Sequence, residues 1–239
     1  MEAIILAGGF GTRLREIVPD TPKPMALIAG RPFLEILMAL LAKKGFRRII
    51  LSLGFMADKI IDHFGNQYMG MELVYEVESL PLGTGGAVRA ALARCVADHA
   101  FVFNGDTYLD FDVTRVEALW RSSLCPVIVV REVTDTARFG RVVLDGGRVT
   151  SFLEKGIAGK GMINAGCYLL PKNVLDDFLS GQNFSLETDF FCVAIQSMKF
   201  SGFVTQGLFI DIGVPDDYTL AQNLLARNLN MKKTKSPTS

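Results

Sequence analysis

Near its start the chain reads Ile4-Ile5-Leu6-Ala7-Gly8-Gly9-Phe10-Gly11-Thr12-Arg13-Leu14, a short apolar strand that runs directly into a glycine-rich turn. The glycines carry no Cβ, so backbone N–H groups can converge there on an anion. Pro22-Lys23-Pro24-Met25 follows and places a lysine between two prolines. Arg13 offers bidentate donors to phosphate oxygens, and Lys23 adds a point charge. The stretch predicts a site for a polyphosphate whose bond is broken.

Two other phosphate-binding patterns do not fit this turn. A dinucleotide-binding fold requires G-x-G-x-x-G after its first strand, and here Gly9-x-Gly11 is followed by Leu14 at the position of the third glycine. A P-loop requires G-x-x-x-x-G-K-[ST], and the chain contains no such string. The turn therefore indicates a different class of nucleotide site.

The composition bounds the class of protein. The chain has 239 residues, of which 49% are hydrophobic, enough for a sizeable core without disulfide or metal staples. Its 25 basic and 25 acidic residues give a net charge of +0, which argues against nucleic-acid or anionic-membrane binding. The sequence does not reveal the oligomeric state, and a homo-oligomer remains open.

The cysteines and the first residues indicate the compartment. Four isolated cysteines without C-x-x-C spacing predict buried, reduced thiols: Cys95, Cys125, Cys167 and Cys192. Met1-Glu2 and a short apolar run read as a first strand, not as a signal peptide, and no apolar run is long enough for a membrane span. We expect a cytoplasmic protein.

Strand-like and helical patterns alternate over about residues 1–125, which is typical of a parallel sheet covered on both faces. The first expected strand ends at residue 7, and three more span 48–53, 72–77 and 100–104. The expected helices span 33–44, 57–64, 87–95 and 113–121. From 126 onward, 127–133, 140–144 and 148–154 resemble antiparallel strands joined by turns. Further strands are expected at 162–170, 202–206 and 209–213, and helices at 173–179, 187–196 and 216–228.

These patterns predict an α/β fold: a single three-layer α/β/α domain over 1–228 with a Rossmann-like, mostly parallel mixed sheet. We expect two halves that share one sheet, about 1–125 with the nucleotide site and about 126–228. The polar segment 229–239 is expected to be a disordered tail.

The opening motif resembles that of the nucleotidyltransferase family that makes nucleoside-diphosphate sugars from a nucleoside triphosphate and a sugar 1-phosphate. The family pattern L-A-G-G-x-G-T-R-L, followed by P-K-P-M, is met at Leu6–Leu14 and Pro22–Met25. The resemblance covers nearly the whole chain. It implies a fold of the nucleotide-diphospho-sugar transferase type, with Arg13 and Lys23 acting on the triphosphate and the transition state.

Nucleotidyl transfer joins two anions, so catalysis rests on positioning and charge neutralisation, and Mg²⁺ suits carboxylates combined with phosphate oxygens. Asp106 follows a buried strand at its carboxyl end, where open α/β sheets bind ligands. Asp211 lies between two isoleucines, where a carboxylate is costly unless it is paired or metal-bound. The family's G-D and D-I-G motifs match both positions, which implies a catalytic Asp106 and a Mg²⁺ site at Asp106 and Asp211.

The resemblance also places the nucleotide. Pro81-Leu82-Gly83-Thr84-Gly85-Gly86 matches the family's base-reading loop, in which Gly83 bonds the base through its main chain. Glu76 and Glu78 precede this loop, and one of them is a candidate for reading guanine, whose N1–H and N2–H₂ suit a carboxylate. The expected nucleotide-binding residues are Leu6, Ala7, Gly8, Gly9, Gly11, Thr12, Arg13, Lys23, Glu78, Gly83, Thr84 and Asp106.

The sugar phosphate is assigned to the C-terminal half. Glu154-Lys155-Gly156 resembles the family's E-K-P, which implies that Lys155 binds the sugar phosphate and Glu154 a sugar hydroxyl, although Gly156 replaces the proline. Asn164-Ala165-Gly166 matches the family's N-A-G segment: Gly166 allows close approach of the sugar ring, and Asn164 can donate to and accept from hydroxyls.

Within the family, the motifs are most similar to those of members that use GTP and D-glycero-α-D-manno-heptose 1-phosphate, which implies a role in making precursors of bacterial surface polysaccharide or glycoprotein. Mannose-1-phosphate guanylyltransferases and N-acetylmuramate-1-phosphate uridylyltransferases are the alternatives among enzymes. The alternative from another class is a non-catalytic subunit that senses sugar nucleotides. Retention of Arg13, Lys23, Asp106 and Asp211 argues for an enzyme.

Overall fold

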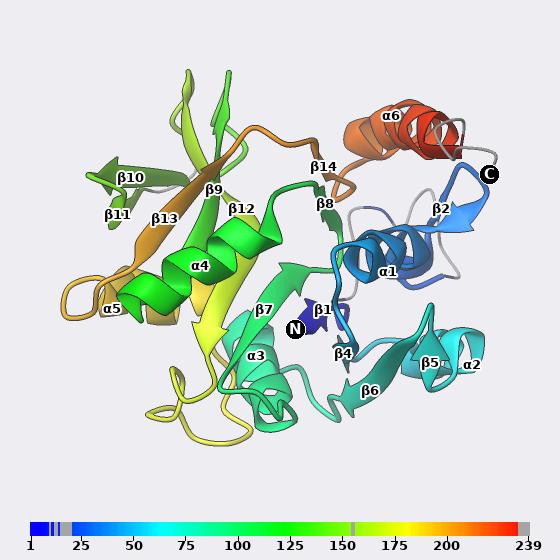
Figure 1. Cartoon of the computed structure of the whole chain (residues 1–239), viewed down its shortest axis with the longest axis horizontal. Helices are drawn as coiled ribbons and strands as arrows, with labels where there is room; N and C mark the ends of the chain where they lie inside the picture. Colours follow the sequence, from blue (N-terminus) through cyan, green and yellow to red (C-terminus); the bar gives the residue numbers. More distant parts are fainter. Residues whose placement is uncertain (10, 12–13, 15–20, 154–155, 234–239) are drawn as a thin grey trace.

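A computed structural model describes residues 1–9, 11, 14, 21–153 and 156–233, with the backbone alone for 227–233. Within these residues the order β10-β11-β13-β9-β12-β7-β1-β4-β6-β5 builds one sheet of ten strands (Figure 1). Their bounds are β1 Glu2–Leu6, β4 Arg48–Leu53, β5 Gln67–Tyr68, β6 Met71–Val77, β7 His99–Asn104, β9 Val127–Val133, β10 Arg141–Asp145, β11 Arg148–Leu153, β12 Gly161–Pro171 and β13 Ser201–Thr205.

The sheet is mixed, as predicted. Strands β7, β1, β4 and β6 run parallel, and β12 joins this group to the C-terminal half by antiparallel pairing with both β7 and β9. Antiparallel pairs prevail in the C-terminal half, although β13 is parallel to β9. Strands from both expected halves therefore lie in one sheet.

Helices cover both faces of the sheet. Ala3 and Ile5 of β1 face α1, α2 and α4, whereas Ile4 faces α3 and η2, and all three side chains are fully buried. This alternation follows from the twofold repeat of a strand. The helices are η1 Lys23–Met25, α1 Phe33–Lys43, α2 Ala57–Phe64, α3 Gly83–Ala93, α4 Val113–Ser123, η2 Leu186–Phe191, α5 Cys192–Ala194 and α6 Pro215–Lys233.

Two small strand pairs complete the framework. Strands β2 (Leu27–Ile28) and β3 (Arg31–Pro32) form a hairpin before α1. Strand β14 (Phe209–Asp211) pairs with β8 (Thr107–Leu109), which directly follows the end of β7. The second pairing matters for the site, because it brings a late segment of the chain to the carboxyl end of the parallel strands.

Four helical segments differ from the sequence prediction by more than two residues. Helix α6 continues to Lys233, so residues 229–233 of the expected disordered tail are helical. Helix α3 begins at Gly83 rather than at 87, so Gly83–Gly86 of the expected glycine loop form its first turn. The segment expected to be a helix at 173–179 is a series of turns, closed by bonds such as Asp176 N–H to Asn173 O. The helix expected at 187–196 is a π-helix (η2) followed by the single turn α5. The wider π turn accommodates Phe190 and Phe191, which are neighbours and both buried.

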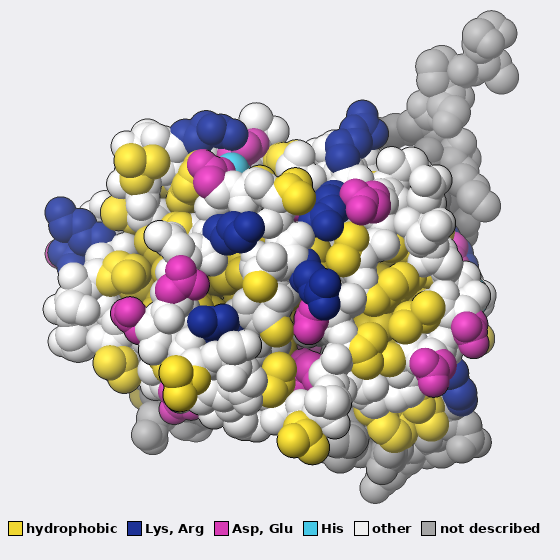
Figure 2. All heavy atoms as spheres, turned by 90° about the horizontal axis from the view of Figure 1, so that it is seen from below, with side chains coloured by type: hydrophobic (Ala, Val, Ile, Leu, Met, Phe, Trp, Pro, Cys, Tyr) yellow, Lys and Arg dark blue, Asp and Glu magenta, His cyan; other side chains and the backbone are white. Residues whose placement is uncertain are grey.

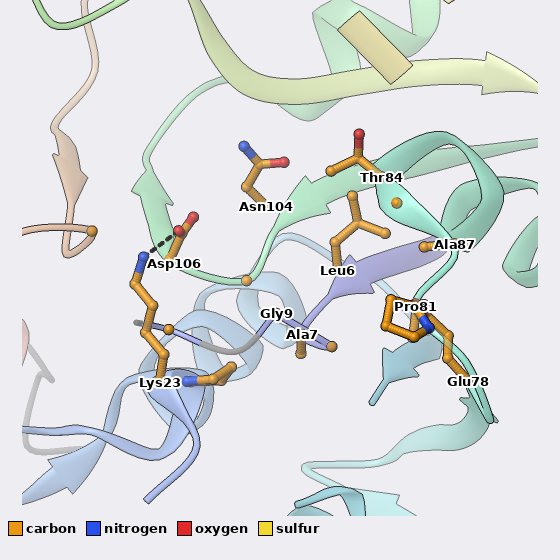
Figure 3. Close-up of a pocket in the computed structure, with 17 residues that line it drawn as sticks. Leu6, Ala7, Gly9, Lys23, Glu78, Pro81, Thr84, Ala87, Asn104 and Asp106 are labelled. Atoms are coloured by element: carbon orange, nitrogen blue, oxygen red, sulfur yellow. Dashed lines mark hydrogen bonds and ion pairs between the residues drawn. The ribbon is translucent and has the colours of Figure 1, made fainter. Parts of the chain in front are cut away.

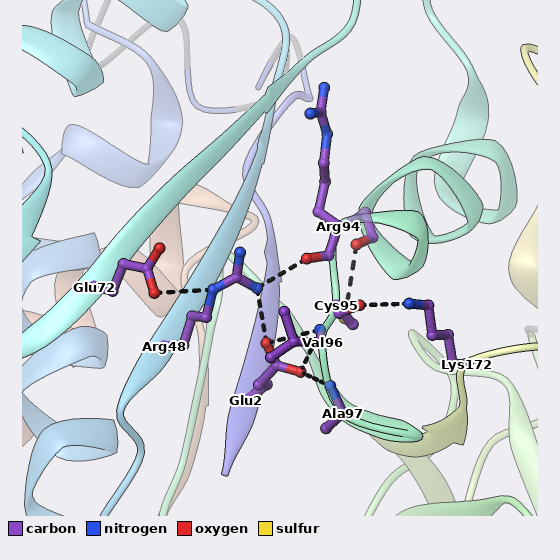
Figure 4. Close-up of polar contacts among 9 residues, drawn as sticks. Glu2, Arg48, Glu72, Arg94, Cys95, Val96, Ala97 and Lys172 are labelled. Carbon is purple, nitrogen blue, oxygen red and sulfur yellow. Dashed lines mark hydrogen bonds and ion pairs between the residues drawn. The ribbon is translucent and has the colours of Figure 1, made fainter.

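A network of hydrogen bonds and ion pairs lies at the edge of the sheet where the parallel strands begin (Figure 4). Arg48 donates to the carboxylate of Glu2 at 2.7 Å and to that of Glu72 at 3.0 Å. Glu2 also accepts from the backbone N–H groups of Val96 and Ala97. Burial alone would raise the pKa of Glu2, but these hydrogen bonds hold it below its usual value. A second cavity of about 500 Å³ lies at this edge, and Glu2, Arg48 and Glu72 line it.

The surface and the thiols show three further features. On the face seen in Figure 2, positive and negative side chains are interspersed. None of the helices in the described part of the chain is both long enough and apolar enough to span a membrane. All four cysteines are free thiols, but only Cys95 and Cys167 are buried; Cys125 and Cys192 are half-buried, which corrects the prediction for that pair.

Candidate active site

A cavity of about 440 Å³ lies where the parallel strands end, as open α/β sheets predict. Lys23 and Asp106 lie at one end of it, Glu78 and Pro81 lie at the other, and Leu6 and its neighbours lie between them (Figure 3). The lining residues are Leu6, Ala7, Gly8, Gly9, Gly11, Lys23, Pro24, Ser52, Glu78, Pro81, Gly83, Thr84, Ala87, Asn104, Gly105, Asp106 and Gly213.

The floor of the cavity is the extension of β1 between its two neighbours. Ala7 N–H donates to Ser52 O at 2.8 Å, and Gly105 N–H donates to Leu6 O at 2.9 Å. A Cβ on residue 105 would lie only 2.4 Å from Leu6 O, so a glycine is required at this close approach. The backbone of Leu6 and Ala7 is thereby held flat against the strand ends.

The glycine-rich turn positions the lysine. Gly11 has a φ of 59°, and a Cβ on it would lie 2.9 Å from Cβ of Lys23. Pro22 and Pro24 set the backbone on either side of Lys23, which begins the 3-10 turn η1. The Lys23 side chain is only 12% exposed, and its ammonium points into the cavity (Figure 3).

The Lys23 ammonium pairs with Asp106, and Asp211 lies near enough to feel the charge of both. Nζ of Lys23 lies 2.5 Å from Oδ2 of Asp106. Asp211 pairs in register with Thr107, and Ile212 N–H donates to Asp106 O at 2.9 Å, so both aspartates lie at the same point. Burial, and then the charge of Asp106, raise the pKa of Asp211.

These residues fit a divalent cation. Asp106 and Asp211 repel one another, and the Lys23 ammonium is paired with Asp106 alone, so a divalent cation between the two carboxylates would stabilise both. Among the described residues there is no cluster of three or more His, Cys, Asp and Glu side chains suited to a metal. Further ligands would be phosphate oxygens and waters, as is usual for Mg²⁺.

Glu78 lies at the other end of the cavity. Its Oε2 accepts the Leu82 backbone N–H at 3.0 Å, and its Oε1 lies 3.4 Å from Ser52 Oγ. The carboxylate therefore faces the first turn of α3, where the helix dipole favours negative charge. Glu76, the other candidate, is instead paired with Arg94 at 2.6 Å and is not among the lining residues.

The expected sugar residues lie beside the cavity. A Cβ on Gly166 would lie 2.6 Å from Nδ2 of Asn104, so the backbone of β12 packs directly on that lining residue. Asn164 donates to Tyr168 Oη at 2.7 Å and to Glu187 Oε1 at 2.6 Å, and its Oδ1 accepts Gly166 N–H at 3.0 Å. Both N–H groups of the amide are therefore used within the protein.

Four predicted site residues lie outside the described residues: Thr12, Arg13, Glu154 and Lys155. The other predicted nucleotide residues all line the cavity. The sequence prediction missed Asn104, although a polar residue at the end of an apolar strand, just before Gly105-Asp106, was a usable signal. It also did not single out Glu187, the partner of Asn164, whose position in η2 has no local signal.

Comparison with known proteins agrees with this geometry. The family model for nucleotidyl transferase matches residues 2–228. The chain belongs to the nucleotidyl transferase family. This confirms the predicted family, enzyme class and fold.

The similar proteins extend the comparison. A D-glycero-alpha-D-manno-heptose 1-phosphate guanylyltransferase from Campylobacter jejuni is 40% identical over 91% of this chain and 97% of its own length. A protein of the same name from Aneurinibacillus thermoaerophilus is 38% identical over 94% and 98%. The crystal structure of HddC from Yersinia pseudotuberculosis complexed with GMP-PN has a TM-score of 0.84 at 40% identity, covering 94% of this chain and 99% of that one.

Proposed function

We propose that this nucleotidyl transferase makes GDP-heptose from GTP and D-glycero-α-D-manno-heptose 1-phosphate in a Mg²⁺-dependent reaction in the cytoplasm, as a precursor of bacterial surface polysaccharide or glycoprotein. Two relatives of almost the same length, both named D-glycero-alpha-D-manno-heptose 1-phosphate guanylyltransferase, support the substrates. The observation that supports the proposal within the chain is one cavity with Lys23 and Asp106 at one end and Glu78 at the other.

The reaction forms one bond and breaks another. An oxygen of the sugar phosphate attacks the α-phosphorus of GTP, and the bond from that phosphorus to the bridging oxygen of the β-phosphate breaks, so that pyrophosphate leaves with the electron pair. Both reactants are anions, and the protein must neutralise them and align them. Gly8, Gly9 and Gly11 line the cavity beside Lys23, where backbone N–H groups can approach phosphates.

Lys23 and the aspartates divide the charge between them. In the structure Lys23 neutralises Asp106, and we propose that it exchanges this partner for phosphate oxygens of the triphosphate. Asp106 and Asp211 would hold Mg²⁺, which supplies charge neutralisation at the phosphates when it is bound. Because Asp211 is disfavoured as an anion by its surroundings, a cation there relieves an existing cost.

Glu78 is proposed to read the base. One oxygen accepts from Leu82 N–H, which fixes the carboxylate and leaves lone pairs on both oxygens for further donors. Guanine presents N1–H and N2–H₂ side by side, and these match a carboxylate, whereas uracil presents one donor between two acceptors. The assignment of Glu78 rather than Glu76 follows from its place in the lining of the cavity.

The proposal is tested by pyrophosphate release from purified protein with the heptose 1-phosphate and each nucleoside triphosphate. We expect GTP to be used best, EDTA to abolish turnover, and Mg²⁺ to restore it. Lys23→Ala should remove most of the rate while leaving the fold intact. A wild-type protein that releases no pyrophosphate with any pair of substrates would support the non-catalytic alternative instead.

A further inference from the structure

Asn164, Tyr168 and Glu187 form a polar cluster that the nucleotide does not explain. An asparagine amide has two N–H donors, and here one donates to Tyr168 Oη and the other to Glu187 Oε1. Glu187 only accepts hydrogen bonds when ionised, so its place beside Asn164 fixes which end of the amide is nitrogen. Tyr168 is buried, and burial strongly raises the pKa of its hydroxyl, so it stays neutral.

The cluster is attached to the cavity from two sides. Leu186 N–H, next to Glu187 in the chain, donates to the hydroxyl of the lining residue Thr84 at 2.9 Å. Gly166, whose N–H donates a hydrogen bond to Asn164 Oδ1, packs on the lining residue Asn104. Thr84 and Asn104 both line the cavity (Figure 3). Glu187 is not itself a lining residue, but it is linked to Thr84 through its chain neighbour Leu186 and to Asn104 through Asn164 and Gly166.

The carboxylate of Glu187 has acceptor capacity to spare. Its side chain is exposed, its Oε1 accepts from Asn164, and no donor among the residues that the structure describes reaches its Oε2. The negative charge is held rigidly, because it is bonded to an amide that is itself bonded at three points. A fixed carboxylate beside a phosphate site repels phosphate, so its natural partners are neutral hydroxyl donors.

We propose that Glu187 is a specificity-determining residue of the sugar subsite, where its carboxylate accepts a hydrogen bond from a hydroxyl of the sugar 1-phosphate. This inference rests on the proposed function. Asn164 is then chiefly the positioning residue for Glu187, with one remaining lone pair on Oδ1 for the sugar. A site built to bond a hydroxyl rejects analogues that lack it much more strongly than a site that merely has room for it.

The test compares Glu187→Ala and Glu187→Gln with the wild type in steady-state kinetics. Glu187→Gln preserves size and the contact with Asn164, so it separates the charge from the packing. We expect KM for the sugar 1-phosphate to rise about tenfold or more in Glu187→Ala, and less in Glu187→Gln, with KM for GTP changed less than about twofold. Glu72→Gln, at the opposite edge of the sheet, is the matched control and should change neither constant.

Sugar 1-phosphates that each lack one hydroxyl identify the partner. For one of them the wild type should lose about tenfold or more in kcat/KM, and Glu187→Ala should show no such loss, because the interaction is already absent. The inference is overturned if the wild type turns over the sugar 1-phosphate but both variants keep its KM, or if every deoxy analogue is penalised equally in wild type and variant. A wild type without any turnover would overturn the proposed function together with this inference.

Discussion

At the scale of single residues, the end of the cavity where we propose that the phosphates bind combines one ammonium with two carboxylates. The Lys23 ammonium lies 2.5 Å from Asp106, and Asp211 stands at the same point through the pairing of β14 with β8. The Asp211 Oδ1 accepts Gly213 N–H at 2.7 Å, which fixes its orientation. This rigidity favours function, and it also means that Asp211 cannot turn away from Asp106.

Asp211→Asn is expected to make the protein more stable and less active. A raised folded-state pKa means that the ionised carboxyl destabilises the folded protein relative to the unfolded chain, fully above the folded pKa and not at all below the unfolded pKa of about 3.9. In EDTA, the variant should therefore have a higher Tm than wild type at pH 7, and the gap should close as the pH falls towards about 4. Turnover should be largely lost.

The control for this prediction is Asp62→Asn, which changes an exposed aspartate of α2. Its Tm should follow that of wild type across the same pH range. An Asp211→Asn variant that melts below wild type at pH 7 would show that ionised Asp211 stabilises the fold, contrary to its surroundings in the structure.

Glu78→Gln should abolish the distinction between GTP and ITP. Inosine lacks the N2 amine of guanine, so a carboxylate that accepts from N2–H₂ should favour GTP by about tenfold or more in the wild type. The glutamine can still accept Leu82 N–H through its oxygen, but it turns its own N–H₂ towards the base. The measurement is kcat/KM for each nucleotide. An equal ratio of kcat/KM for GTP over ITP in the variant and the wild type would show that Glu78 does not read the base.

How far the site could be predicted depends on whether its residues share a local motif. Lys23, Asp106 and Glu78 each lie next to a strand end or a proline-flanked turn, and strand order brings such points together. Glu187 lies in a segment whose position is set by the packing of Phe190 and Phe191 and by a bond to Thr84, none of which is readable from neighbouring residues.

At the scale of elements, the start of α3 depends on contacts with the segment before η2. The backbone N–H of Gly85 donates to Phe184 O at 2.9 Å, and Phe184 N–H donates to Leu82 O at 3.0 Å. The Phe184 ring stacks on Phe178 with centroids 3.9 Å apart. The loop that carries Pro81, Gly83 and Thr84 into the cavity is thus held by an element of the other half of the chain.

Gly85→Ala should therefore reduce both stability and nucleotide affinity. A Cβ there would lie 2.2 Å from the Phe184 ring, so the ring and α3 must move apart, at a cost of about 1–3 kcal/mol. Urea unfolding should show the loss, and KM for the nucleotide should rise. Gly140→Ala, whose Cβ would meet its nearest neighbour at an ordinary 3.4 Å, is the control. Equal stability of Gly85→Ala and wild type would contradict this packing.

Some helices and strands could be predicted from neighbouring residues, and others could not. The ranges predicted for β4, α2 and β9 agree with the structure at both ends, because their apolar periodicity and flanking turns are local. The turns at 173–179 were predicted as a helix because their spacing of apolar residues is helical. There the Phe178 ring is held by Phe184, and its backbone carbonyl accepts a hydrogen bond from Arg89, both distant in sequence.

At the scale of the whole molecule, the reactivity of the four cysteine thiols tests which of them are buried in the core. Burial raises the pKa of Cys95 to about 12 and that of Cys167 well above its usual value, so neither forms the reactive thiolate at neutral pH. We expect a thiol reagent at pH 8 to label Cys125 and Cys192 in the folded protein, and Cys95 and Cys167 only on unfolding. Rapid labelling of all four in native buffer would contradict the buried positions.

The sheet joins the two halves that the sequence distinguishes. β12 pairs with β7 on one side and with β9 on the other, so the strand that carries Asn164 and Gly166 lies beside the strand that leads to Asp106. The residues predicted for the nucleotide and for the sugar therefore lie on neighbouring strands of one sheet. The change from parallel to antiparallel texture near 126 was predictable, but the order of the strands was not, because it is set by long-range pairing.

The most direct test of the proposed guanylyl transfer to a heptose is an internal competition. Purified protein, Mg²⁺, equal concentrations of the common nucleoside triphosphates, and equal D-glycero-α-D-manno-heptose 1-phosphate and mannose 1-phosphate are mixed, and the nucleotide sugars formed are identified by mass spectrometry. Initial product ratios under competition equal ratios of kcat/KM. The account predicts GDP-heptose as the main product. A predominance of GDP-mannose would contradict the heptose and assign mannose 1-phosphate as the sugar substrate. A predominance of a uridine-diphosphate sugar would contradict guanine as the base and Glu78 as the residue that reads it.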